Sequence, residues 1–148
     1  MQQILFLCTG NYYRSRFAEE YFNYYAQIRA LNYRADSKGL ARDMVTTGNV
    51  GPMSLYAIAM LRSLRIPAVR RNRFPLSVYL ADFEHVDKVI LLSGREHQPM
   101  LTEHFGDKVD SAIVHAFDIE DVHIEPETTA LPRLRDSLDR LLSALPSR

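Results

Sequence analysis

Eight residues near the N-terminus have the types and spacing of a phosphate-binding loop with a nucleophile at its base. They read Cys-Thr-Gly-Asn-Tyr-Tyr-Arg-Ser over positions 8–15, so that five residues separate Cys8 from Arg14. A loop that ends a strand and opens a helix points several backbone N–H groups at one spot, where the helix dipole adds positive potential. An oxyanion fits there, with Cys8 beneath it as a thiolate nucleophile and Arg14 offering a planar fork to two phosphoryl oxygens.

The other residues of the octad are expected to build the cradle. The predicted phosphate-binding set is Thr9, Gly10, Asn11, Tyr12, Tyr13, Arg14 and Ser15. The Ser15 hydroxyl can donate to the sulfur, and Asn11 can orient the loop because its side chain both donates and accepts hydrogen bonds. The alternative is a buried structural cysteine with a surface arginine nearby. A strand before the loop, a glycine within it and a helix after it favour the functional interpretation.

Strands and helices that alternate along the chain are expected to position this loop. The apolar run 4–7 predicts a buried strand that ends at Cys8, and apolar spacing from Phe17 to Leu31 predicts a helix directly after the loop. Further strands are expected at 33–36, 87–92 and from 112, further helices at 55–64, 96–105 and 134–145, and a long loop at 37–52. The pattern predicts an α/β fold with an open four-stranded parallel sheet and helices on both faces. Ligands of such sheets bind beyond the carboxyl ends of the strands, where Cys8 falls.

Composition indicates one globular domain over residues 1–148. The chain is 47% hydrophobic and has zero formal net charge, although residues 1–75 carry 11 basic and 4 acidic side chains. The apolar run at 4–8 is too short for a signal peptide or a membrane span, so a cytoplasmic protein without a membrane or nucleic-acid partner is expected. A single cysteine excludes an intramolecular disulfide and a multi-cysteine zinc site, and no metal is expected. The arginines at 70, 71 and 73 are expected to lie in a solvated loop.

At the octad the sequence resembles the low-molecular-weight protein tyrosine phosphatase family, whose loop reads Cys-x-Gly-Asn-x-Cys-Arg-Ser-Pro after the first strand. Weaker matches follow in the family's order: 37–39 resembles its Ser-Ala-Gly, 51–52 its entry into helix two, and 118–121 its Asp-Ile-Pro-Asp-Pro-Tyr segment. The resemblance covers nearly the whole chain. It implies a cysteine-dependent phosphomonoesterase, a hydrolase that works through a phosphocysteine intermediate on a CX5R loop without a cofactor.

A leaving oxygen must receive a proton, and the acidic segment 118–121 contains the candidate acids. By the resemblance, Asp121 occupies the position of the family's general acid, so the implied catalytic residues are Cys8, Arg14 and Asp121. Asp118 is the alternative acid. His123 falls where the family commonly has an aromatic residue, so Tyr12 and His123 are expected at the substrate rim. The other interpretation of the segment is a solvated loop.

Several residues depart from the family's pattern. Tyr12 and Tyr13 replace a smaller residue and the second loop cysteine, while Arg16 and Val122 stand where the family has proline. The ring of Tyr12 is expected to narrow the entrance, stack on an aromatic substrate or block it. The expected function is a protein tyrosine phosphatase acting on a phosphorylated protein or a small phosphomonoester. The alternatives are an arsenate reductase that uses an external thiol, and a phosphate- or phosphoprotein-binding module without turnover.

Overall fold

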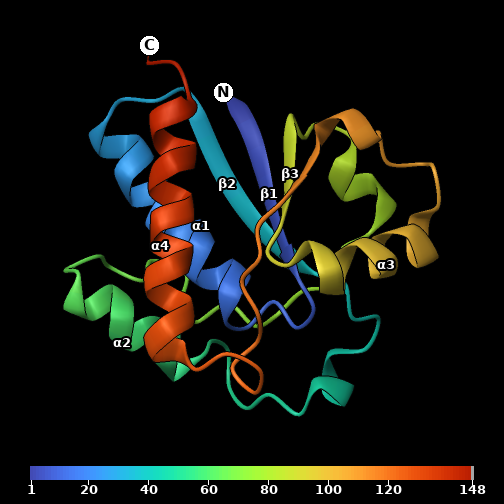
Figure 1. Cartoon of the computed structure of the whole chain (residues 1–148), viewed down its shortest axis with the longest axis horizontal. Coiled ribbons are helices and arrows are strands. Elements are labelled where there is room, and N and C mark those ends of the chain that lie inside the picture. The colour runs from blue at the N-terminus through green and yellow to red at the C-terminus, as the bar shows by residue number, and fades with distance from the viewer. Residues whose placement is uncertain (148) are drawn as a thin grey trace.

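Strands and helices alternate along the chain, as the sequence pattern predicts. The computed structural model describes residues 1–147. In chain order its elements are β1 (Gln2–Cys8), α1 (Arg14–Ile28), β2 (Tyr33–Gly39), α2 (Leu55–Ser63), β3 (Lys88–Leu91), α3 (Gly94–Phe105), β4 (Val114–Ala116) and α4 (Glu127–Ala144). Short 3-10 turns occupy 44–47, 80–83 and 111–113. Figure 1 shows the sheet between α1 and α4 on one side and α3 on the other.

The four strands form one parallel sheet in the order β2-β1-β3-β4. The predicted four-stranded parallel sheet is confirmed. β1 is central, and its apolar residues from Ile4 to Leu7 are buried on both faces, which explains why they form a continuous hydrophobic run. The carboxyl ends of the strands meet at the lower edge of the sheet in Figure 1, where the loop after β1 lies.

Alternate residues of β1 face two separate hydrophobic layers. Ile4 and Phe6 pack with residues of α1 and α4, whereas Leu5 and Leu7 pack with residues of α3. The prediction of helices on both faces is therefore confirmed. Within residues 1–147, none of the helices combines the length and the apolar character that crossing a bilayer requires.

The second strand is longer than predicted. Residues 37–39, expected in a loop, pair in parallel register with 6–8 of β1. Their small or polar side chains hide the strand from a hydrophobic pattern. Gly39 is required by close packing, because a Cβ there would lie 2.7 Å from the carbonyl oxygen of Thr9. The fourth strand begins at Val114 rather than Ala112, because Asp110 accepts a hydrogen bond from the Ala112 N–H and caps a 3-10 turn (3.0 Å).

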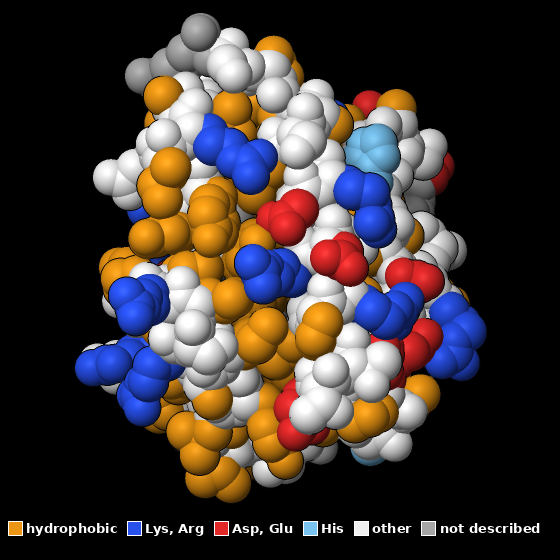
Figure 2. Space-filling model, turned by 60° about the vertical axis from the view of Figure 1, so that its left-hand side comes forward, with side chains coloured by type: hydrophobic (Ala, Val, Ile, Leu, Met, Phe, Trp, Pro, Cys, Tyr) orange, Lys and Arg blue, Asp and Glu red, His pale blue; other side chains and the backbone are white. Residues whose placement is uncertain are grey.

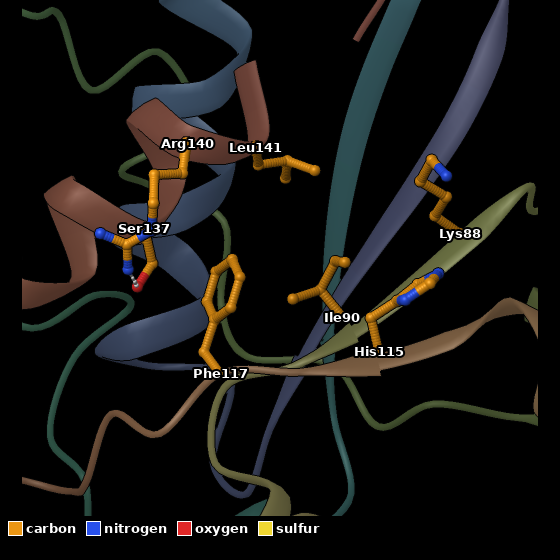
Figure 3. Close-up of a pocket in the computed structure, with 7 residues that line it drawn as sticks. All are labelled: Lys88, Ile90, His115, Phe117, Ser137, Arg140 and Leu141. Atoms are coloured by element: carbon orange, nitrogen blue, oxygen red, sulfur yellow. Dashed lines mark hydrogen bonds between the residues drawn. The ribbon is translucent and has the colours of Figure 1, made fainter. Parts of the chain in front are cut away.

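A cavity of about 340 Å³ separates α4 from the β3–β4 side of the sheet. Figure 3 shows the side chains of Ile90, Phe117 and Leu141 directed toward one another across it. None of the predicted site residues lines this cavity, which is lined by Lys88, Ile90, His115, Phe117, Ser137, Arg140 and Leu141. The predicted chemistry belongs instead to a larger cavity around Cys8.

Candidate active site

The loop of residues 8–15 leaves the carboxyl end of β1 and opens α1, which begins at Arg14. Asn11, at its centre, has a positive φ of 48°, a conformation that asparagine tolerates better than most residues. Within the described chain, the backbone N–H groups of Thr9 to Tyr13 have no protein acceptor. Unpaired N–H groups of consecutive loop residues at a helix N-terminus form an anion-binding site.

Cys8 lies at the base of this loop and is almost completely buried. Its Sγ is 3.0 Å from the Oγ of Ser15. The Asn11 side-chain amide donates to the same Oγ at 2.9 Å, which leaves the Ser15 hydroxyl hydrogen free to point at the sulfur. The arrangement can stabilise negative charge on the sulfur, as a nucleophile or as a leaving group.

A buried network below the loop holds Asn11 in place. Its Oδ1 accepts from Arg73 Nη1 at 3.0 Å and from the Leu76 N–H at 3.1 Å, while its Nδ2 also donates to Ser37 Oγ at 3.0 Å. Arg73 Nη2 lies 3.4 Å from Glu19 Oε1, and the Glu19 side chain is fully buried. The prediction that Arg73 lies in a solvated loop is therefore wrong. Arg73 supports the phosphate-binding loop through Asn11.

Arg16 ties three segments together where the family has proline. Its guanidinium donates to the carbonyl of Pro52 at 2.9 Å and to that of Arg70 at 2.8 Å, and it approaches the carbonyl of Asn11 at 3.5 Å. Burial, together with the nearby charge of Arg73, lowers the pKa of Arg16 to about 10, so Arg16 stays charged at neutral pH. A proline could make none of these contacts, so this replacement adds a support.

Arg14 is buried and held by Glu96 of α3. Nη1 and Nη2 donate to Oε1 and Oε2 at 3.1 and 2.9 Å, and Nη1 also donates to the carbonyl of Ile119 at 2.9 Å. Glu96 thus binds the Nη1–Nη2 edge of the guanidinium. The Nε–Nη2 edge keeps two N–H groups for a second bidentate partner, such as two phosphoryl oxygens.

Two further side chains reach Glu96. The Thr9 hydroxyl donates to Oε2, and His97 Nε2 lies 3.0 Å from the same oxygen. Burial alone raises the pKa of the Glu96 carboxyl, but His97, Arg14 and Thr9 together hold that pKa well below its usual range. Burial in turn lowers the pKa of His97, whose Nδ1 accepts the Ser93 N–H. Glu96 is therefore ionised at neutral pH and can pair with the charge of Arg14.

We expect Glu96→Gln to reduce kcat about 10- to 100-fold, because an amide can no longer orient Arg14 with two charged hydrogen bonds. Inhibition by vanadate, which resembles the transition state, should weaken more than inhibition by phosphate. Glu103→Gln, on the exposed face of the same helix, is the matched control. Vanadate inhibition equal to that of the wild type would show that Glu96 does not position Arg14.

Asp121 and His123 lie at the mouth of the cavity above Cys8. This cavity has a volume of about 580 Å³. It is lined by Cys8, Gly10, Tyr12, Tyr13, Arg14, Thr47, Asn49, Ser54, Leu55, Tyr56, Asp121, Val122 and His123. Asp121 Oδ1 accepts the Val122 N–H at 2.8 Å, and Oδ2 lies 3.6 Å from His123 Nδ1. Asp121 thus lines the same cavity as Cys8.

Asp118, the alternative acid, does not line this cavity. Its side chain is 83% exposed and forms an ion pair with Arg133 at 2.9 Å. The same arginine binds Glu125 at 2.8 Å, so it fixes the segment that carries Asp121 to α4. The geometry therefore favours Asp121 over Asp118 as the acid.

Both loop tyrosines line the cavity, but they make different contacts. Tyr12 lines the cavity, and its hydroxyl donates to the carbonyl of Val50 at 2.6 Å while its own carbonyl accepts the Ser54 N–H at 2.9 Å. Tyr13 is buried against the ring of Tyr56, and its hydroxyl has no hydrogen-bond partner in the described chain. Burial raises the pKa of Tyr13, which keeps its hydroxyl neutral. Tyr12 forms a wall of the cavity and does not plug it.

Neither Glu96 nor the part played by Arg73 is predicted by the sequence pattern. Glu96 stands three residues after Ser93, whose hydroxyl accepts the Glu96 N–H at 3.3 Å and begins α3. This Ser-x-x-Glu pattern predicts a helix start, and nothing in it indicates that the carboxylate reaches Arg14. Among the described residues, no three His, Cys, Asp or Glu side chains are placed to share a metal ion.

Comparisons with known proteins agree with this fold. YfkJ from Bacillus subtilis superposes with a TM-score of 0.82 at 20% identity, over 97% of this chain and 94% of that one. A low molecular weight protein tyrosine phosphatase from T. tengcongensis gives 0.79 at 22% identity, over 98% and 100% of the two chains.

YwlE arginine phosphatase from Geobacillus stearothermophilus gives a TM-score of 0.75 at 21% identity, over 97% and 92% of the two chains. Among curated proteins, none matches the sequence significantly. The family model for low molecular weight phosphotyrosine protein phosphatase matches residues 3–141, nearly the whole chain. The chain therefore belongs to the low molecular weight phosphotyrosine protein phosphatase family.

Proposed function

We propose that this member of the family hydrolyses aryl phosphomonoesters, phosphotyrosine above all, with Cys8 as nucleophile and Asp121 as general acid. The observation that carries the proposal is Cys8 at the base of a loop with unpaired N–H groups, beneath a cavity that Asp121 also lines. The loop and the free edge of Arg14 bind the phosphoryl oxygens. The walls contributed by Tyr12 and Tyr56 suit an aromatic leaving group.

The reaction then proceeds in two displacements. The Cys8 sulfur attacks phosphorus in line, the bond from phosphorus to the leaving oxygen breaks, and Asp121 gives its proton to that oxygen. The loop N–H groups and Arg14 stabilise the equatorial oxygens. In the second displacement Asp121 takes a proton from water as the water attacks phosphorus. The bond from sulfur to phosphorus breaks, and inorganic phosphate leaves.

Phosphate release from a panel of substrates tests this proposal. The panel holds phosphotyrosine, phosphoarginine, phosphoserine and para-nitrophenyl phosphate, with arsenate and an added thiol as a separate arm. Highest kcat/KM on the two aryl phosphates supports the proposal. A preference for phosphoarginine would make this protein an arginine phosphatase, as YwlE is named. Binding of phosphate without turnover would make it a phosphate-binding module.

The bond from Tyr12 to Val50 gives a prediction about the cavity wall. Tyr12→Phe keeps the ring and removes a hydrogen bond worth about 1 kcal/mol, so the segment 47–54 is less restrained. We expect KM for para-nitrophenyl phosphate to rise about fivefold, which is the change that about 1 kcal/mol of lost binding free energy produces. We expect kcat to change less than about twofold. Tyr24→Phe, a half-buried tyrosine of α1, is the control. An unchanged KM would mean that the bond does not shape the cavity.

A further inference from the structure

Five exposed apolar side chains line the cavity above Cys8 or adjoin its lining residues, and we call them the apolar rim. They are Val50, Leu55, Tyr56, Val122 and Ile124, with 83%, 78%, 50%, 37% and 55% of each residue exposed. Leu55, Tyr56 and Val122 line the cavity itself. Val50 is joined to it through Tyr12, and Ile124 follows directly on the lining residue His123. Three members of the apolar rim therefore line the cavity, and the other two adjoin residues that line it.

Exposed apolar side chains are common on protein surfaces, and exposure alone does not mark a site. Figure 2 shows several on the face brought forward from the left of Figure 1. The apolar rim differs because its members come from two segments far apart in sequence, 50–56 and 122–124, that meet at one cavity. An apolar patch beside a recognition pocket is the usual sign of a ligand or partner surface.

The charges at the cavity say which partner fits. Among its lining residues, Arg14 is the arginine, and the other side chains of acidic or basic type are Asp121 and His123. Arg14 is already paired with Glu96 and lies at the base, out of reach of residues that flank the phosphate. Among the residues that the structure describes, no lysine or further arginine lines the cavity to attract an acidic segment.

We propose that the apolar rim binds the residues next to the phosphorylated side chain, an inference that rests on the proposed function. The substrate class is then a protein segment whose phosphotyrosine is flanked by aliphatic or aromatic residues. Its phosphoryl group enters the loop, its ring passes between Tyr12 and Tyr56, and its neighbours cover the apolar rim. Acidic flanks lose this contact and must bring charged carboxylates against apolar side chains.

Three phosphotyrosine peptides test the proposal, with valine and leucine, serine, or aspartate on both sides of the phosphotyrosine. We expect the wild-type kcat/KM for the apolar peptide to exceed that for the serine peptide about tenfold, and that for the aspartate peptide by more. Leu55→Ser and Ile124→Ser should each reduce the ratio of the apolar to the serine peptide to within about threefold. Because both peptides are measured on the same variant, general loss of activity cancels.

Val69→Ser is the matched control, because Val69 is 81% exposed but does not line this cavity. Its ratio should equal that of the wild type. Peptide affinities for Cys8→Ser protein, measured by fluorescence anisotropy, test the preference without turnover. Turnover or binding of all three peptides with equal efficiency overturns the apolar rim and leaves the proposed function standing. Absence of turnover on every aryl phosphate overturns the proposed function, and the affinities then decide on the apolar rim alone.

Discussion

Cys8→Ser protein should release phosphate from para-nitrophenyl phosphate at less than about a thousandth of the wild-type rate, while it still binds phosphate or vanadate. The hydroxyl that replaces the thiol is a poor nucleophile at neutral pH, whereas the loop N–H groups and Arg14 are unchanged. Steady-state kinetics gives the first quantity, and isothermal titration with phosphate gives the second.

The pairing of these two measurements distinguishes loss of chemistry from loss of structure. Because Cys8 is buried and contacts Ser15 at 3.0 Å, a smaller oxygen changes the packing little. Ser54→Ala, in the wall of the same cavity, offers a control in which a hydroxyl is removed without touching the sulfur. A Cys8→Ser variant that keeps more than about a hundredth of the wild-type rate of phosphate release would show that Cys8 is not the nucleophile.

The loop was readable from the sequence because its chemistry is local. A strand, a tight turn and a helix follow one another within residues 2–28, and the unpaired N–H groups arise from that local path alone. The residues that support the loop were not readable in the same way. Glu96 reaches Arg14 from 82 positions away, and Arg73 reaches Asn11 from 62. Such pairs depend on where the sheet places α3 and the segment before β3.

The prediction of strands and loops from the sequence was limited by long-range contacts in the same way. Strands with apolar residues were predicted within a few positions, whereas the end of β2 was missed because Ser37 serves the polar network below the loop. A run of arginines predicts a solvent-exposed loop, yet Arg70 and Arg73 both form ion pairs with the buried Glu19. Glu19 lies one helical turn after Ser15, and its buried charge requires a partner. Hydrophobic periodicity carries no information about such pairs.

Asp121→Asn should slow phenyl phosphate about 100- to 10,000-fold and para-nitrophenyl phosphate far less. Phenoxide is a strong base that must be protonated as it leaves, whereas nitrophenoxide leaves readily without a proton. The variant should therefore show a steep dependence of kcat on the basicity of the leaving group, measured over a series of substituted phenyl phosphates. The wild type should show little dependence, because Asp121 neutralises the leaving oxygen in every case.

Asp118→Asn is the matched control, because it makes the same change three residues earlier in the same segment. Its carboxylate binds Arg133 at the surface, so its removal should cost at most about 1 kcal/mol of stability and leave the leaving-group dependence flat. The two variants thus separate a proton donor from a residue that anchors the segment. A steep dependence in Asp118→Asn, with a flat one in Asp121→Asn, would make Asp118 the acid and would require residues 118–121 to move by several ångströms when substrate binds.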